Sequence, residues 1–239
     1  MKIEALIFDK DGTLLDFDAF WISVSVKALE DVLAHYGMQQ VPMEALLAPL
    51  GVRDGVTDPD GILCKGTYGQ IGQAVYDVLC QYGFSAPCRE LVDRVTDSYS
   101  QNAHAGQIRP TCPALAEVLG GLKDRGLRLA VVTTDNREVT EICLKTLGIY
   151  QLFDKIYTDD GNTPVKPDPA CALDFMNLVG ADKASTLMVG DTLTDVRFAR
   201  NAGIKVLGVA KTPASRALLQ SADRIISDPS ELPSVLSLC

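Results

Sequence analysis

Two aspartates one residue apart, Asp9 and Asp11, follow an apolar run in the stretch IFDKDGTLLD near the start of the chain. Unpaired carboxylates are costly in a low-dielectric interior, so the pair is either part of a turn or held by a cation and used. A carboxylate of fixed position can act as a covalent nucleophile. In an extended segment Asp11 would project to the same side, about 6–7 Å along the chain, and could exchange protons with a leaving group and with water. Lys10 would point the other way, and we expect no chemical step from it.

Two further acids, Asp191 and Asp195, follow another apolar run in VGDTLTD. At the end of a strand, Asp191 can join Asp9 and a backbone carbonyl around Mg²⁺, which prefers an octahedral shell of oxygen ligands. Asp195 comes one helical turn later, where it is suited to hold a metal-bound water. The alternative is that Asp191 and Asp195 are an N-cap and a first-turn acid, which the helix dipole favours.

Hydroxyl and lysine side chains at two other places could bind a phosphate group. Thr133 and Thr134 end the apolar run of VVTTDN before a predicted helix, where hydroxyls and backbone N–H groups can hold phosphate oxygens. Helix capping is the alternative, above all for Thr134. Lys166 stands between prolines in PVKPDPA, and the proline after it favours an extended backbone at this lysine. Its charge could be directed at a phosphate or at Asp9, although an ordinary surface lysine is the alternative.

Six β-rich segments alternate with helical patterns along most of the chain. The predicted strands are 3–9, 127–135, 185–191 and 204–210, with weaker candidates at 153–160 and 222–228. The predicted helices among them are 112–125, 136–147, 168–179, 193–202, 213–221 and 229–238. This alternation indicates an α/β fold with a Rossmann-like, doubly wound parallel sheet covered on both faces. Ligands of such sheets bind at the carboxyl ends of the strands, where the acids, the threonines and Lys166 would converge.

Residues 16–106 break this alternation and indicate a second domain. Helical patterns run over 18–37, 41–48, 69–83 and 87–104, and no convincing strand is found among them. We therefore predict an inserted all-helical cap domain at 16–106 and a catalytic core made of 1–15 and 107–239. A lid of this kind can exclude water and select substrates.

Substrate selection would fall to the cap, where two basic residues are candidates. Arg53 in GVRDG and Lys65 in CKGTYGQI could each reach a substrate carboxylate or a second phosphate. The alternative for the second stretch is purely structural, because Thr67 and Gln70 have the spacing of a capping box at a helix start.

Composition limits the possible partners of the 239-residue chain. A formal net charge of −9 argues against binding to nucleic acid or to an anionic membrane, which normally requires a basic face. We find no secretory signal and no apolar stretch long enough to span a bilayer. The seven cysteines are scattered and contain no CxxC pair, which fits buried thiols in a reducing cytoplasm.

Taken together, four motifs resemble those of the haloacid dehalogenase-like superfamily, specifically its phosphoglycolate phosphatase-like branch with a helical cap. They occur in the family's order as FDKDGTL, VVTTD, VKPDP and GDTLTD, and the resemblance runs from residue 3 to about 210. It implies that Asp9 is the nucleophile, which becomes an aspartyl phosphate, and that Asp11 is the general acid/base. The same resemblance assigns further roles: phosphate binding to Thr133, Thr134 and Lys166, Mg²⁺ binding to Asp9, the Asp11 carbonyl and Asp191, and metal support to Asp195. Similar phosphatases often have Asn where this chain has Thr134, which leaves the role of that residue open.

The resemblance implies a Mg²⁺-dependent phosphatase that acts on a small phosphorylated metabolite, phosphoglycolate-like or a sugar phosphate. Dehalogenases of the superfamily lack an acid at the position of Asp11, so carbon–halogen cleavage is not expected. One alternative is a sugar-phosphate mutase, which tends to carry a histidine in the first cap helix; DFDAFWISV (16–24) has none. A second alternative is a non-catalytic member that binds a phosphorylated ligand, although such a protein would not need an acid/base.

Overall fold

The computed structural model describes residues 3–103, 105–161 and 164–237. The last position of the predicted helix 229–238 and Cys239 lie outside these residues. The chain divides into two compact units, one made of residues 1–16 and 108–239 and the other of residues 17–107.

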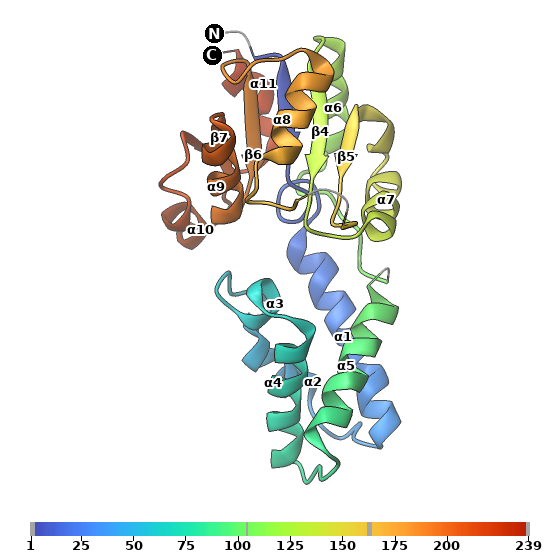
Figure 1. Ribbon diagram of the computed structural model, residues 1–239. Helices are drawn as coiled ribbons and strands as arrows, with labels where there is room; N and C mark the ends of the chain where they lie inside the picture. Colours follow the sequence, from blue (N-terminus) through green and yellow to red (C-terminus); the bar gives the residue numbers. More distant parts are fainter. Residues whose placement is uncertain (1–2, 104, 162–163, 238–239) are drawn as a thin grey trace. The chain divides into compact units, whose positions relative to one another are not determined.

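The first unit contains a six-stranded parallel sheet in the order β5-β4-β1-β6-β7-β8. Its strands are β1 (Ala5–Phe8), β4 (Arg128–Val132), β5 (Lys155–Tyr157), β6 (Thr186–Gly190), β7 (Lys205–Val209) and β8 (Arg224–Ile226). All six predicted strands, including the two weaker candidates, are confirmed. The first strand of the chain is central, because β1 pairs with β4 on one side and β6 on the other (Figure 1).

Each face of the sheet has its own apolar core, because alternate residues of a strand point to opposite faces. Leu6 and Phe8 contribute to one core, and Ala5 and Ile7 contribute to the other. The first core is covered by α6 (Leu115–Asp124), α7 (Arg137–Thr146) and α11 (Leu232–Leu236). The second is covered by α8 (Ala170–Val179) and α9 (Leu193–Ala202), and α10 (Pro213–Leu218) follows β7. Short 3₁₀ helices occur at η2 (Tyr150–Leu152) and η3 (Pro229–Glu231). The doubly wound parallel sheet predicted from the sequence is thus confirmed.

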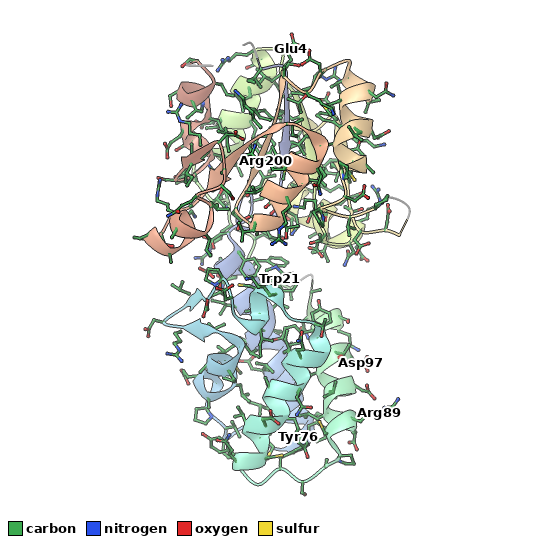
Figure 2. All side chains as sticks on the ribbon, turned by 60° about the vertical axis from the view of Figure 1, so that its left-hand side comes forward. Glu4, Trp21, Tyr76, Arg89, Asp97 and Arg200 are labelled. Atoms are coloured by element: carbon green, nitrogen blue, oxygen red, sulfur yellow. The ribbon has the colours of Figure 1, made fainter. Side chains whose placement is uncertain are left out.

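The second unit is built mainly from helices. These are α1 (Phe17–Tyr36), α2 (Met43–Leu47), α3 (Ile62–Lys65), α4 (Tyr68–Gln81), α5 (Cys88–Asn102) and the 3₁₀ helix η1 (Ala48–Leu50). Figure 2 shows its side chains, with Trp21 labelled on α1 and Tyr76 on α4. Gly72 lets α4 approach α5 closely, since a Cβ there would lie 2.9 Å from the Cα of Val92. The predicted capping box is confirmed, because Thr67 accepts from the Gln70 N–H and its own N–H donates to the Gln70 side chain.

A short hairpin makes the expectation of an all-helical insertion wrong. β2 (Val52–Arg53) and β3 (Val56–Thr57) pair antiparallel across a two-residue turn. Both turn residues, Asp54 at φ 51° and Gly55 at φ 74°, have the positive φ that favours glycine and that tight hairpin turns require. Asp18 on α1 anchors the hairpin by accepting hydrogen bonds from the backbone N–H and the hydroxyl of Thr57, at 3.0 and 2.6 Å.

Two expectations about the chain as a whole can be compared with the structure. None of the helices in the described residues is both long and apolar enough to cross a membrane. The six cysteines of the described residues are all free, and Cys112, Cys143 and Cys171 are buried as expected. Cys80 is exposed, so the expectation of buried thiols is wrong for this residue.

Candidate active site

The central strands deliver three of the predicted site residues to the same edge of the sheet. Asp9, Thr133 and Asp191 directly follow the carboxyl ends of β1, β4 and β6, which are neighbours in the sheet. The Asp9 N–H donates to the carbonyl of Val189 at 2.9 Å, which fixes the backbone where it leaves β1. The topology therefore places these residues together, as the parallel sheet requires.

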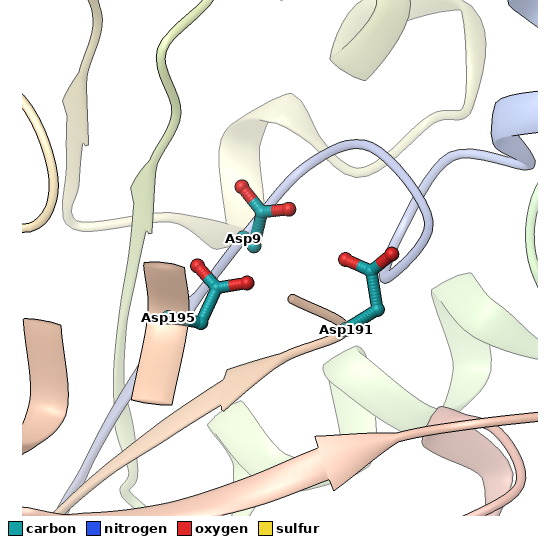
Figure 3. Close-up of side chains that lie close together, drawn as sticks. All are labelled: Asp9, Asp191 and Asp195. Carbon is teal, nitrogen blue, oxygen red and sulfur yellow. The ribbon is translucent and has the colours of Figure 1, made fainter. Parts of the chain in front are cut away.

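Three carboxylates form a compact group at this edge. Asp9, Asp191 and Asp195 each offer an oxygen within 4.8 Å of the others, and their side chains point toward a common space in Figure 3. Burial raises the pKa of Asp9 to about 6, and burial together with the neighbouring acids raises the pKa of Asp191 well above its ordinary value. The group thus carries more negative charge than its surroundings favour.

Glycine 12 makes room for Asp191. Gly12 has φ +77°, and a Cβ at this position would lie 2.0 Å from an Asp191 carboxylate oxygen. The buried Thr13 hydroxyl donates a hydrogen bond to Asp191 Oδ1 at 3.3 Å. Gly12 and Thr13 of the first motif therefore both contact Asp191 and fix its position.

Lys166 joins two of the acids. Its Nζ lies 2.5 Å from Asp9 Oδ1 and 2.7 Å from Asp195 Oδ1, and the lysine side chain is only 4% exposed. Burial works against the charged ammonium, but the two carboxylates outweigh it and hold the pKa of Lys166 above its ordinary value. The surface-lysine alternative is therefore wrong, and Lys166 presents a permanent charge beside Asp9.

Asp195 also stabilises the start of α9. Its Oδ2 accepts hydrogen bonds from the backbone N–H and the hydroxyl of Thr192, and the Thr192 hydroxyl accepts from the Asp195 N–H. Thr192 is the N-cap, so the alternative of Asp191 as the N-cap is wrong. Capping and the ion pair with Lys166 use different oxygens of one carboxylate, and Asp195 therefore serves both.

Asp11 is not a member of this carboxylate group and is paired with Lys10. The Lys10 ammonium lies 2.8 Å from Asp11 Oδ1 and 2.7 Å from Oδ2, and 3.1 Å from Asp135 Oδ2. The expectation that Lys10 points away from Asp11 is therefore wrong. It assumed strand alternation, but β1 ends at Phe8 and the chain then turns, with the Lys10 carbonyl accepting from the N–H groups of Leu14 and Leu15.

The two threonines differ in their environment. Thr133 is buried, and its hydroxyl oxygen accepts a hydrogen bond from the Asp135 N–H at 3.2 Å. Thr134 is exposed. The helix-capping alternative for Thr134 is wrong, because Asn136 caps α7 by accepting from the Val139 N–H at 2.9 Å.

The two candidate substrate residues lie in the unit of residues 17–107. Arg53 on β2 is exposed and lines a hollow together with Thr57 and Asp58. Lys65, at the end of α3, is exposed and forms an ion pair with Asp60. Neither arrangement tests contact with a substrate, which stays a prediction.

The carboxylate group has the donor chemistry of a Mg²⁺ site. All its ligand atoms are carboxylate oxygens, which hard divalent cations prefer. Lys166 neutralises part of the charge on Asp9 and Asp195, whereas Asp191 has no lysine or arginine within ion-pair distance among the described residues. A divalent cation beside Asp191 and Asp9 would stabilise their ionised carboxylates, which burial and the neighbouring acids disfavour.

A family model described as "Haloacid dehalogenase-like hydrolase" matches residues 67–209. The chain belongs to this family. The chain is 29% identical to the pyrophosphatase PpaX of Bacillus mycoides, over 99% of this chain and 98% of the relative.

Solved structures show the same fold. A predicted phosphoglycolate phosphatase from Haemophilus somnus is similar with a TM-score of 0.70 and 21% identity, covering 98% of each chain. A protein described as the HAD-hydrolase YfnB from Bacillus subtilis, bound to magnesium, is similar with a TM-score of 0.67 and 19% identity, covering 99% of each chain. The fold of these structures thus extends over nearly the whole chain.

The contact between Gly190 and Asp195 leads to a prediction. A Cβ at Gly190 would lie 2.4 Å from the Asp195 carboxyl carbon. We expect Gly190→Ala to displace Asp195 from Lys166, to lower stability by about 1–3 kcal/mol and to reduce phosphatase activity at least about tenfold. Urea unfolding and steady-state kinetics measure the two effects.

Gly120→Ala provides the matched control. Gly120 lies on α6, and a Cβ there would meet nothing within 4 Å. This change should leave activity unchanged and stabilise the protein by up to about 1 kcal/mol, because alanine favours a helix. Wild-type activity and stability in Gly190→Ala would contradict the proposed crowding.

Proposed function

We propose that this hydrolase is a Mg²⁺-dependent phosphatase that cleaves a small phosphate monoester, phosphoglycolate-like or a sugar phosphate, through an aspartyl phosphate on Asp9. The observation that carries the proposal is the position of Lys166. Its buried ammonium group lies 2.5 Å from Asp9 at the carboxyl edge of the sheet. A fixed positive charge beside a carboxylate is what phosphoryl transfer to that carboxylate requires.

In the proposed reaction Asp9 attacks the phosphorus atom. A bond forms between an Asp9 carboxylate oxygen and phosphorus as the ester P–O bond breaks, and Asp11 gives its proton to the departing alkoxide. Water then attacks the phosphoryl group, Asp11 takes the proton from that water, and the P–O bond to Asp9 breaks to release phosphate. The Lys166 ammonium and the Thr133 hydroxyl bind the transferring phosphoryl oxygens, with Thr134 at the edge of the same loop.

Mg²⁺ would be held by the carboxylates of Asp9 and Asp191 and the carbonyl of Asp11, with support from Asp195. Bound there, the ion would neutralise charge on the phosphoryl group and on the acids. Arg53 and Lys65 stay candidates for recognition of the rest of the substrate, and residues 17–107 would act as the cap that selects it.

The acid/base bears on one of the two alternatives. Retention of Asp11 beside Lys10 favours catalysis over simple binding of a phosphorylated ligand. Transfer back to the substrate, as in a sugar-phosphate mutase, would use the same residues and is separated from hydrolysis only by its products. Similarity to PpaX over nearly the whole chain adds pyrophosphate as a second candidate substrate.

A cytoplasmic location is supported by the free cysteines of the described residues.

Metal removal tests the proposal. Purified protein with Mg²⁺ should release phosphate from an aryl phosphate, and EDTA should reduce the rate at least about a hundredfold, because charge neutralisation at the phosphoryl group is lost. Added Mg²⁺ in excess of EDTA should restore the rate. Turnover that continues unchanged in EDTA would contradict the proposed site.

A panel of phosphorylated metabolites, with pyrophosphate included, would identify the substrate class. Phosphate release and sugar-phosphate isomerisation are measured in the same reactions. Faster isomerisation of a hexose phosphate than release of phosphate would establish the mutase instead. Ligand binding without either product would establish a non-catalytic member.

A further inference from the structure

Lys10 is a fully buried lysine at the carboxyl edge of the sheet. Its side chain has no exposed surface, and a buried ammonium is rare in proteins unless carboxylates pair with it. Removing such a charge from water is costly, so anionic partners must lie close to it. The carboxylates of Asp11 and Asp135 are those partners, and they outweigh burial in keeping the Lys10 pKa above its ordinary value.

The contacts of Lys10 hold Asp11 in one orientation. Both Asp11 oxygens lie within 2.8 Å of the ammonium, so the carboxylate is held at two points and not at one. Asp11 precedes Gly12, whose positive φ of 77° belongs to a turn. The ion pair therefore supplies side-chain order at a place where the backbone turns sharply.

Asp135 anchors the other side of Lys10. Its backbone N–H donates to the Thr133 hydroxyl, and its carbonyl accepts from the Asp159 N–H at 2.9 Å. Through Asp135, the lysine thus joins the loop after β1 to the loop after β4, and Asp11 lies at a fixed place relative to Thr133.

Two lysines divide the acids of the site between them. Lys166 pairs with Asp9 and Asp195, and Lys10 pairs with Asp11 and Asp135. The proposed nucleophile and the proposed acid/base therefore have separate cationic partners. Each lysine thus orients its own pair of carboxylates.

We propose that Lys10 is a positioning residue that acts through Asp11 and places its carboxyl group for proton transfer to the leaving group. The inference rests on the proposed function, since it takes Asp11 as the acid/base. A misplacement of about 1 Å can cost about a hundredfold in rate, and general acid catalysis contributes about 10²–10⁴-fold, so loss of Lys10 should be visible in kinetics.

The experiment compares two leaving groups in Lys10→Met. An alkoxide leaves poorly without a proton, whereas 4-nitrophenolate leaves without one. We expect kcat/KM for the alkyl phosphate that the wild type hydrolyses best to fall at least about 30-fold, and kcat/KM for 4-nitrophenyl phosphate to fall less than about threefold. Phosphoryl transfer to Asp9 is the step that kcat/KM reports, so the later hydrolysis step does not blur the comparison.

Asp11→Asn provides the reference pattern. It should show the same preference for the good leaving group, and Lys10→Met combined with Asp11→Asn should lose no more than Asp11→Asn alone, because both act on one proton transfer. Lys10→Arg should recover part of the alkyl phosphate activity, since it keeps the charge. Exposed Lys183, changed to Met, is the control and should behave as wild type with both substrates.

Equal losses with both substrates, or additive losses in the double variant, would overturn the inference. Should Lys10→Met fail to fold, Asp135→Asn tests the same idea, because it loosens the anchor and keeps the lysine; it should show the same preference at a smaller size. The outcomes for Lys10 and for the proposed function separate cleanly. An active Asp9→Asn variant would refute the function, whereas an inactive one with no leaving-group preference in Lys10→Met would refute only the role of Lys10.

Discussion

Asp9→Asn is expected to reduce phosphatase kcat at least about a thousandfold and to leave the protein folded. An amide cannot form the aspartyl phosphate, and only positioning and charge stabilisation remain. The fold should tolerate the change because the amide oxygen can still accept a hydrogen bond from Lys166. The ion pair between Lys166 and Asp195 is also unchanged. Burial already raises the pKa of Asp9 to about 6, so a neutral side chain of the same shape suits the site. Stopped phosphate-release assays and thermal unfolding measure the two outcomes.

Asp124→Asn is the control for this substitution. Asp124 is an exposed acid at the end of α6 in the same unit, and its change should leave both kcat and the unfolding midpoint as in wild type. A kcat of Asp9→Asn within tenfold of the wild-type value would contradict the assignment of Asp9 as the nucleophile. A further check is mass spectrometry of acid-quenched wild-type protein, which should carry one phosphoryl group on the peptide that contains Asp9.

Lys166→Met is expected to have the second-largest effect, on both activity and stability. Removing one partner of a buried ion pair leaves an uncompensated charge and costs about 3–5 kcal/mol, and here two carboxylates lose their partner. Loss of a charge that binds the transferring phosphoryl group should reduce kcat about 10²–10³-fold. Urea unfolding in EDTA measures the stability effect without help from a metal.

Lys183→Met separates the site effect from the loss of a lysine. This exposed lysine has the same chemistry at the surface, and its replacement should change stability by less than about 0.5 kcal/mol. Added Mg²⁺ should recover part of the stability of Lys166→Met, because the cation would pair with Asp9 in place of the ammonium. Wild-type kinetics in Lys166→Met would show that this lysine is structural only.

The parallel sheet and the positions of its strands along the chain could be predicted, because buried parallel strands are short, nearly continuous apolar segments. Even the short strands β5 and β8, three residues each, followed from apolar residues between turns. The place of the site followed in turn, since parallel strands bring their carboxyl ends to one edge. Asp9, Asp191 and Lys166 could therefore be singled out before any coordinate was known.

Details that depend on local turns were harder to predict. The partner of Lys10 could not be inferred, because strand alternation ends at Phe8 and the turn that follows has no simple period. The hairpin at residues 52–57 did have a signal, since an Asp-Gly pair, here between Arg53 and Val56, is typical of a tight turn, but its strands have only two residues each. Thr192 and Asp195 likewise have the spacing of a capping box, which would have identified Thr192 as the N-cap.

The central place of β1 makes assembly of the sheet depend on segments that are synthesised much later. Ala5 pairs with Arg128 on one side and Thr186 on the other, so both contacts close very long loops. Such contacts form slowly, whereas the helices of the second unit have all their mutual contacts within residues 17–107 and can pack once that segment is made. On the ribosome, the helical unit would therefore fold before β4 and β6, the strands that pair with β1, have been synthesised. The proposed nucleophile is therefore synthesised long before the strands β4 and β6 that pair with β1 beside it.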